Sequence, residues 1–202
     1  MLSKIRSIFV SFGLLLFSIS GGLWVGYSSS LANSQPLLRP QVEGISTEER
    51  SKTVGEPVEI TIGKIGIKAA IEKVGLTSDG RMDVPADVNN GGWYMYGAKP
   101  GEFGSSVIAG HLDTNEAKPA LFYRLGELSS GDEIQIRDRQ GNTYRFVVER
   151  TEVFEDKSFP LAQVFAADDK SRLNLITCYG NYDSDTNNYD RRMVVFSTLK
   201  RG

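Results

Sequence analysis

This chain of 202 residues has only one cysteine, Cys178. A disulfide within the chain is therefore excluded, although exported domains usually use their cysteines in pairs. The Cys178 thiol is either free or bonded to another molecule. A free cysteine is most often a small buried hydrophobic residue, and the sequence alone leaves this interpretation open.

An excess of charge of either sign is also lacking. Lys and Arg number 23, Asp and Glu number 25, and the formal net charge is -2, with no basic patch along the chain. No basic field is present to attract nucleic acid, so nucleic acid is not expected as a partner. Apolar residues make up 40% of the chain, which is enough to form a buried core. The length predicts one globular domain plus a leader.

Long apolar runs are lacking except for one near the N-terminus, from Ile8 to Tyr27. It is about long enough to span a bilayer as a helix, and Lys4 and Arg6 before it favour a cytoplasmic N-terminus with the remainder exported. Ser30-Leu31-Ala32 also has small residues at the spacing that a signal peptidase uses. We therefore expect residues 1–32 to be a single-pass membrane anchor or a cleaved signal peptide. The rest of the chain would lie outside the cell, and it would be secreted if the signal is removed.

The segment after this run changes character twice. Residues 33–56 are rich in Ser, Gln, Pro, Glu and Lys without an apolar period, which predicts a flexible linker. Residues 57–202 contain short apolar or alternating runs separated by Gly, Asp and Asn, which predict a mostly β domain closed or nearly closed into a barrel. Only KPALFYRLGEL and PLAQVFAADD could form short helices. The predicted strands are VEITIG, GIKAAIEKVGL, SSVIAG, DEIQIR, TYRFVVERTEVF, RLNLIT and MVVFSTL.

The single histidine completes a chemical pair with the single cysteine. His111 stands at the end of the run VIAGHLDT, and Cys178 stands at the end of LNLITCYG. A nucleophilic thiol needs a nearby group that moves its proton or stabilises its thiolate, and histidine is the side chain that titrates near neutrality. The chain holds one candidate for each role.

Two arginines, Arg191 and Arg192, open the last apolar run in NYDRRMVVFSTL. Attack of a thiolate on a carbonyl develops negative charge on oxygen, and a guanidinium fixed on a strand is a strong donor to that oxygen. Neighbouring residues on a strand face opposite sides, so at most one of the two can share a site with Cys178. The segment between Cys178 and the arginines is polar and is expected to be a loop.

The motifs VIAGHLDT, LITCYG and YDRRMVVFS, in this order, resemble those of the sortases, cell-surface cysteine transpeptidases of mainly Gram-positive bacteria. The stretches GGWYMYGAKPGEFGSSVIAGHLD and ALFYRLGEL are most similar to class F sortases. The resemblance implies an eight-stranded sortase barrel with Cys178 as nucleophile, His111 as acid and base, and Arg192 as oxyanion donor. Arg191 remains the alternative donor.

The same resemblance implies that Thr177 and Asp113 contact the substrate. Thr177 matches the residue before the nucleophile, whereas Asn174 stands where many sortases have a threonine. DSDTNN, from Asp183 to Asn188, lacks the glycine and the final glutamate of a calcium loop. No metal and no cofactor are expected.

The function implied by the resemblance is cleavage of a Leu-Pro-x-Thr-Gly-like motif between Thr and Gly, followed by transfer to an amine. The partners would be surface proteins with a C-terminal sorting signal, an amine acceptor such as a cell-wall precursor peptide or a pilin lysine, and the membrane through the N-terminal segment. A chemically different hypothesis is a membrane-tethered, non-catalytic β-barrel that binds a surface partner and merely buries Cys178.

Overall fold

The computed structural model describes residues 53–114, 116–167 and 169–200. The expected N-terminal helix and most of the expected linker lie outside these ranges. Within them, none of the helices combines the length and the apolar character that a membrane span requires.

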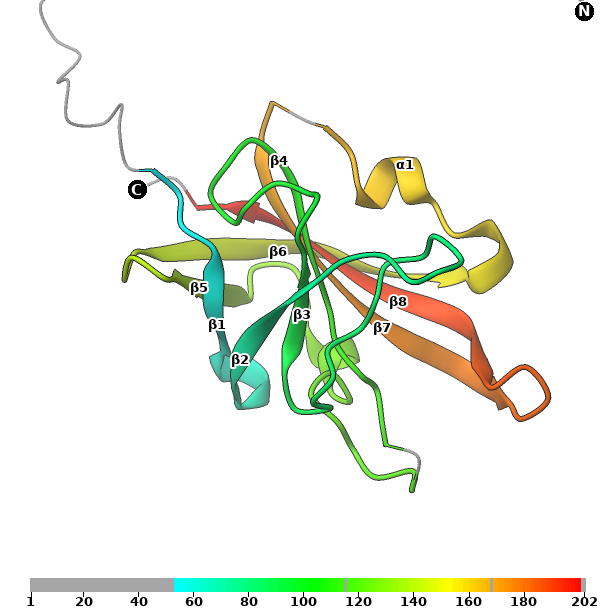
Figure 1. Ribbon diagram of the computed structural model, residues 1–202. Coiled ribbons are helices and arrows are strands. Elements are labelled where there is room, and N and C mark those ends of the chain that lie inside the picture. Colours follow the sequence, from blue (N-terminus) through cyan, green and yellow to red (C-terminus); the bar gives the residue numbers. More distant parts are fainter. Residues whose placement is uncertain (1–52, 115, 168, 201–202) are drawn as a thin grey trace, which may run out of the picture. The chain divides into compact units, whose positions relative to one another are not determined.

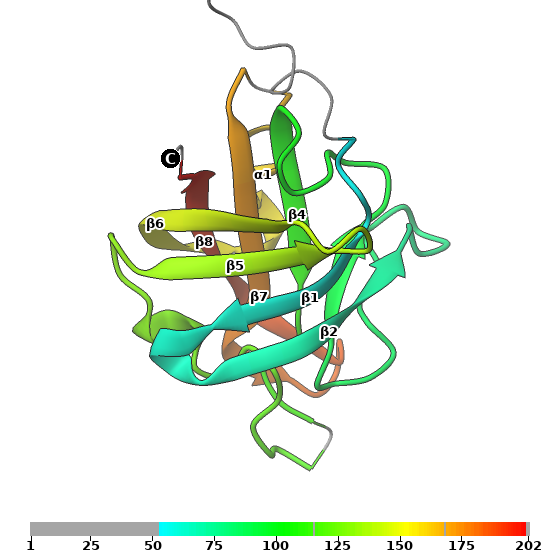
Figure 2. The ribbon, with the colours of Figure 1, turned by 90° about the vertical axis from the view of Figure 1, so that its left-hand side faces the viewer.

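Eight strands close into a barrel, in the order β1-β2-β3-β4-β7-β8-β6-β5. All neighbouring strands run antiparallel except the parallel pairs β2–β3 and β4–β7. Figure 2 shows β1, β2 and β5 on the near wall, with β4 and β7 behind them. This confirms the mostly β, eight-stranded barrel. The strands are β1 (Pro57–Ile62), β2 (Ile67–Val74), β3 (Gly91–Tyr94), β4 (Gly104–Ala109), β5 (Glu133–Asp138), β6 (Thr143–Glu155), β7 (Ser171–Asp183) and β8 (Asn188–Leu199).

The helices among the described residues are single turns. Three are 3₁₀ turns, η2 (Gly63–Ile65), η3 (Leu125–Glu127) and η4 (Asp156–Ser158), and the fourth is α1 (Leu161–Val164). The two stretches that predicted short helices contain η3 and α1. Both helices are shorter than the stretches that suggested them, since η3 has three residues and α1 has four.

Apolar side chains fill the interior of the barrel and also cover part of its outer wall. Leu173 and Leu175 of β7 and Val195 of β8 point inward and are fully buried. A second cluster lies outside β4, β7 and β8, where Val194 and Phe196 pack with Val164 of α1. These three strands are therefore buried on both faces, which explains why their apolar residues form continuous runs rather than a clean alternation.

The sequence prediction missed β3. This strand consists of Gly91, Gly92, Trp93 and Tyr94, and glycine weakens a strand signal because it has no side chain to pack. Gly92 is required here: a Cβ at this position would lie 2.9 Å from Cδ of Pro85.

The expectation of a loop between Cys178 and the arginines is confirmed for residues 184–187, which form a turn, and is wrong for the residues on either side of them. β7 continues to Asp183 and β8 begins at Asn188, so most of this segment belongs to a β-hairpin. Figure 1 shows this end of the β7–β8 pair projecting from the barrel. Tyr182 and Tyr189 face each other across it with ring centroids 5.3 Å apart. Cross-strand aromatic contacts of this kind stabilise a strand pair whose Asn and Asp residues disfavour it.

Residues just before the predicted domain boundary at 57 already contact the barrel. The Gly55 amide donates to Oδ2 of Asp138 at 3.0 Å, and the Arg139 amide donates to the Glu56 carbonyl at 2.9 Å. Asp138 is buried, so the loss of a donor to its carboxylate is costly.

A truncated chain that begins at Thr53 should therefore be more stable than one that begins at Pro57. We expect a difference in the free energy of unfolding of about 1–3 kcal/mol, the range for a buried polar group that loses a partner. Urea denaturation followed by tryptophan fluorescence would measure it. Equal midpoints and slopes would show that Gly55 and Glu56 contribute nothing.

Candidate active site

Cys178 lies on β7, between β4 on one side and β8 on the other. In the antiparallel β7–β8 pair its direct partner is Arg192, whereas the partner of Arg191 is Tyr179. Residues directly opposite in such a pair have Cβ atoms about 4.5–5.5 Å apart on the same face. The register therefore brings the thiol and the guanidinium of Arg192 to one face of the sheet.

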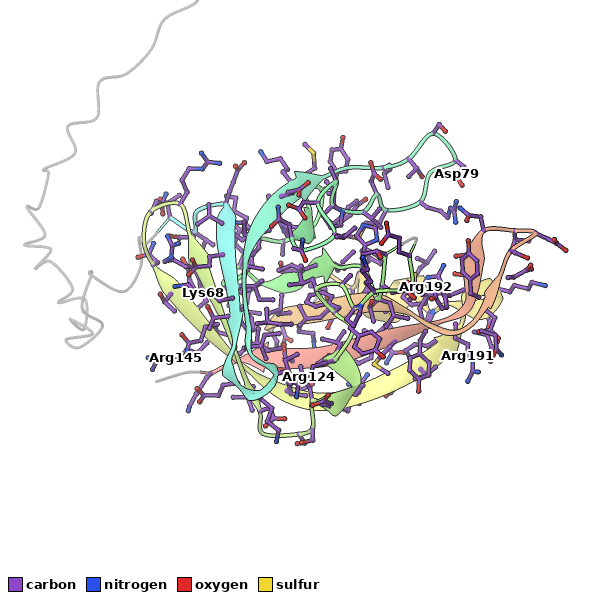
Figure 3. All side chains as sticks on the ribbon, turned by 90° about the horizontal axis from the view of Figure 1, so that it is seen from below. Lys68, Asp79, Arg124, Arg145, Arg191 and Arg192 are labelled. Carbon is purple, nitrogen blue, oxygen red and sulfur yellow. The ribbon has the colours of Figure 1, made fainter. Side chains whose placement is uncertain are left out.

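That face is the outer one. Alternation along the strands places Cys178 with Asn174 and Ile176, and Arg192 with Val194 and Phe196, on the side of the second apolar cluster. Arg191 faces the other way, where its guanidinium carbon lies 5.8 Å from the centroid of the Tyr179 ring. Figure 3 labels both arginines at the hairpin. Only Arg192 shares a face with Cys178.

Hydrogen bonds fix the Arg192 guanidinium on both of its terminal nitrogens. Nη1 donates to the carbonyls of Tyr189 and Arg191 at 2.9 and 2.8 Å. Nη2 donates to Oδ1 of Asn188 at 2.6 Å and forms an ion pair with Asp156 at 3.0 Å. Asn188 in turn donates to Asp156 at 3.1 Å. A guanidinium held this way is preorganised, because it loses little further entropy when it binds an anion.

His111 reaches the site from the opposite neighbour of β7. The parallel β4–β7 register pairs Ala109 with Ile176, and the Gly110 amide donates to the Ile176 carbonyl at 3.0 Å. If the register is continued by two residues, His111 stands level with Cys178. Its own carbonyl accepts from the Phe122 amide at 2.9 Å, which fixes the backbone. The three predicted catalytic residues thus come from two adjacent strands, β7 and β8, and from the segment that directly follows β4 on the other side of β7.

The imidazole and the residue before it are also constrained. Nε2 of His111 is 3.0 Å from the carbonyl oxygen of Pro85. Gly110 lies directly against the Phe122 ring, where a Cβ would be only 2.4 Å from Cδ2. A side chain at position 110 would have to displace Phe122, so glycine is needed for His111 to take its place.

Burial raises the pKa of the Cys178 thiol above its ordinary value. The Arg192 cation opposes this effect, whereas the carboxylates of Asp113 and Asp156 also raise the Cys178 pKa. Asp113 accepts a hydrogen bond from the Tyr189 hydroxyl at 2.5 Å, and this bond and burial raise the pKa of Tyr189 to about 12. The cysteine is half-buried. Burial, the largest of these influences, disfavours the thiolate.

Asp113→Asn should make Cys178 more reactive toward iodoacetamide at pH 8. Removal of the Asp113 charge lowers the Cys178 pKa, so more of the thiol is ionised at a pH below that pKa, and the gain in thiolate outweighs its weaker nucleophilicity. The rate should rise with pH in both proteins, with the lower midpoint in the variant. Tyr189→Phe is the matched control, since it removes the hydrogen bond and keeps the Asp113 charge. A slower reaction of Asp113→Asn would contradict the electrostatic account.

Thr177 does not join this arrangement. It lies opposite Met193 on the inner face of β7 and is only 3% exposed, and its hydroxyl has no hydrogen-bond partner among the described residues. The structure therefore does not support direct contact of this side chain with a substrate on the Cys178 face. Asn174, the departure from the family pattern, has a structural contact: its amide donates to the Val164 carbonyl of α1 at 2.6 Å.

A cavity of about 610 Å³ opens beside His111 and Asp113. Cys178 is not part of its lining, so the cavity adjoins the histidine side of the site. No group of three or more potential ligand side chains that could hold a metal occurs among residues 53–114, 116–167 and 169–200. The lining is formed by Val84, Pro85, Ala86, Val88, His111, Asp113, Thr114, Glu116 and Lys118.

Several residues of the site were not predicted from the sequence. Asp156 and Pro85 are distant in the chain from the groups they contact, and no local pattern marks them. Tyr189 and Asn188 stand in the polar segment that was expected to be a loop. Their closeness to the arginines along the chain was the only available signal.

The comparison with protein families agrees with the barrel fold. Residues 60–200 match the model of the sortase domain. The chain belongs to the sortase family, which consists of cysteine transpeptidases. No curated protein sequence matches this chain.

Solved sortase structures of several classes share the fold. Sortase C-1 of Actinomyces oris aligns with a TM-score of 0.56 at 20% identity, covering 72% of each chain. Sortase A of Listeria monocytogenes aligns with a TM-score of 0.55 at 19% identity, and the alignment covers 74% of this chain and 89% of that one. Sortase D5 of Clostridium perfringens aligns with a TM-score of 0.54 at 24% identity, and the alignment covers 76% of this chain and 85% of that one. At these identities the similarity establishes the fold.

Proposed function

We propose that this sortase cleaves a Leu-Pro-x-Thr-Gly-like motif between Thr and Gly and transfers the acyl part to an amine. The observation that carries the proposal is the register of β7 and β8, which places Cys178 opposite Arg192 on the outer face. His111 adds a proton carrier at the end of the next strand. The half-buried state of Cys178 also favours a reactive thiol over a fully enclosed structural one.

In the first half-reaction the Cys178 thiol gives its proton to His111, and the resulting thiolate attacks the threonine carbonyl carbon. Negative charge develops on the carbonyl oxygen, where Arg192 stabilises it. His111 protonates the glycine nitrogen as the carbon–nitrogen bond breaks, which leaves a thioester on Cys178. In the second half-reaction His111 takes a proton from the incoming amine, the amine attacks the thioester, and the sulfur departs as thiolate.

The acceptor amine has an approach route in this scheme. The cavity beside His111 is bordered by Asp113 and Glu116, whose carboxylates suit a cationic amine, although Lys118 offsets part of their charge. Water in place of the amine would give hydrolysis.

The class, the cellular location and the substrates that we propose are based on the sequence resemblance. We place the protein nearest to class F, with its catalytic domain outside the cell and the membrane reached through residues 1–32. The substrates would be surface proteins with a C-terminal sorting signal. The acceptors would be a cell-wall precursor peptide or a pilin lysine.

One experiment tests the activity directly. The protein is incubated with a library of quenched sorting peptides and several amine acceptors, and the products are identified by mass. We expect cleavage after threonine and a product extended by the amine. Absence of cleavage across the library would contradict the proposal.

A thiol reagent separates the enzyme from a non-catalytic barrel. The folded protein is treated with a methanethiosulfonate reagent, and modification is compared with that of the urea-unfolded chain. A catalytic cysteine reacts in the folded state, whereas a structural one resists until the protein unfolds.

A further inference from the structure

One hydrogen bond to the His111 ring restricts the position of its proton. Nε2 of His111 lies 3.0 Å from the carbonyl oxygen of Pro85. A carbonyl oxygen accepts hydrogen bonds and never donates them, so Nε2 must carry a hydrogen. In the neutral ring, Nδ1 is then the nitrogen with the free lone pair. No hydrogen bond involves Nδ1 among the residues that the structure describes.

The Pro85 carbonyl is held firmly. Pro85 is buried, and it sits on the bare backbone of Gly92, where a Cβ would lie 3.1 Å from the Pro85 nitrogen. In the parallel β2–β3 pair the partner of Gly92 is Glu72. Glu72 therefore lies beside Gly92, the residue that Pro85 contacts.

The Glu72 carboxylate binds the segment that follows Pro85. It accepts hydrogen bonds from the amides of Ala86 and Asp87 at 2.9 and 3.2 Å and from Nδ2 of Asn90 at 2.9 Å. The bond from Asn90, followed by the one from Ala86, lowers the Glu72 pKa despite partial burial. Glu72 is thus an anion at neutral pH, with three donors directed at it.

The Pro85–Ala86 peptide group joins these contacts. Its N–H donates to Glu72, and its C=O accepts from His111. The peptide is trans, since the described residues contain no cis bond, so the two groups point in opposite directions along one rigid plane. An anion at the N–H end strengthens the acceptor at the other end, because successive hydrogen bonds polarise one another.

We propose that Glu72 is a positioning residue for His111, acting through the Pro85–Ala86 peptide group to keep the hydrogen on Nε2 and leave Nδ1 to exchange protons. This inference rests on the proposed catalytic role of His111. In the imidazolium form, Nδ1–H gives its proton to the departing glycine nitrogen. The resulting neutral ring accepts a proton at Nδ1 from the incoming amine, while Nε2–H stays on Pro85 throughout.

Nuclear magnetic resonance can test the ring state because His111 is the only histidine in the chain. The full chain, labelled with nitrogen-15 histidine and held in detergent micelles, gives signals from a single imidazole. At a pH where the ring is neutral we expect one tautomer, with the hydrogen on Nε2. A ring protonated on Nδ1, or an even mixture of tautomers, would overturn the proposal without any variant.

Glu72→Ala tests the chain of contacts. We expect its Nδ1 and Nε2 signals to move toward the average of the two tautomers. We also expect kcat for peptide transfer to fall roughly tenfold to a hundredfold with a smaller change in KM, as for a misplaced catalytic group. Glu72→Gln keeps one acceptor oxygen and should give intermediate values. Glu59→Ala is the control, because Glu59 on β1 pairs with Arg137 at 3.1 Å and should leave both readouts unchanged.

The outcomes separate the two proposals. Unchanged ring signals and kcat in Glu72→Ala would refute the positioning role. Lower activity with unchanged ring signals would also refute it, since a merely structural effect gives that result. A wild-type protein with the expected tautomer but no transfer activity would instead refute the proposed function. If Glu72→Ala does not fold, the ring signals and kcat of Glu72→Gln, together with the tautomer of the wild-type protein, still test the positioning role.

Discussion

Cys178→Ala is expected to abolish thioester formation and peptide transfer while the barrel stays folded. The substitution removes the nucleophilic sulfur, and no second thiol exists in the chain to replace it. The side chain is half-buried, so the free energy of unfolding should change by about 1 kcal/mol or less. Single-turnover acylation and urea denaturation, measured on the same preparations, would show both results.

A peptide with an electrophile in place of the scissile bond provides the complementary test. It should label wild-type protein once, at Cys178, and leave Cys178→Ala unlabelled. Equal cleavage of sorting peptides by wild type and Cys178→Ala would exclude Cys178 as the nucleophile. It would also favour the non-catalytic barrel, with a contaminating peptidase as the source of the activity.

Arg192→Ala is expected to lower the rate of acylation by roughly a hundredfold or more, as loss of a preorganised oxyanion donor does. Arg191→Ala is the matched control and should be mild, because its guanidinium lies on the opposite face near Tyr179. Arg192→Lys should recover only part of the rate. An ammonium lacks the planar fork that bonds Asn188 and two backbone carbonyls at once.

Alkylation of Cys178 gives a second readout for the same variants. Because the Arg192 charge lowers the Cys178 pKa, Arg192→Ala should raise that pKa further and slow the reaction with iodoacetamide at a fixed pH. Arg191→Ala should react like the wild type. A severe loss of acylation in Arg191→Ala with near-normal Arg192→Ala would transfer the donor role to Arg191.

The sequence by itself determined the class of fold and the candidate nucleophile and base. Period-two apolar runs with Gly, Asp and Asn between them predicted a β-barrel, and the structure confirms it. A single cysteine and a single histidine at the ends of two such runs left one candidate for each role. These features are local or compositional, so they can be read without knowing which strands are neighbours.

The tertiary structure decided which residues meet. Arg191 and Arg192 cannot be separated by composition, since both open the same strand; the β7–β8 register places only Arg192 opposite Cys178. The inner position of Thr177 likewise follows from strand pairing. Asp156 pairs with Arg192, which lies in a different element of the chain. Glu72 on β2 likewise binds the amide of Ala86, in the segment that contains Pro85. Contacts across the barrel depend on register and closure, and no local pattern of residues encodes these.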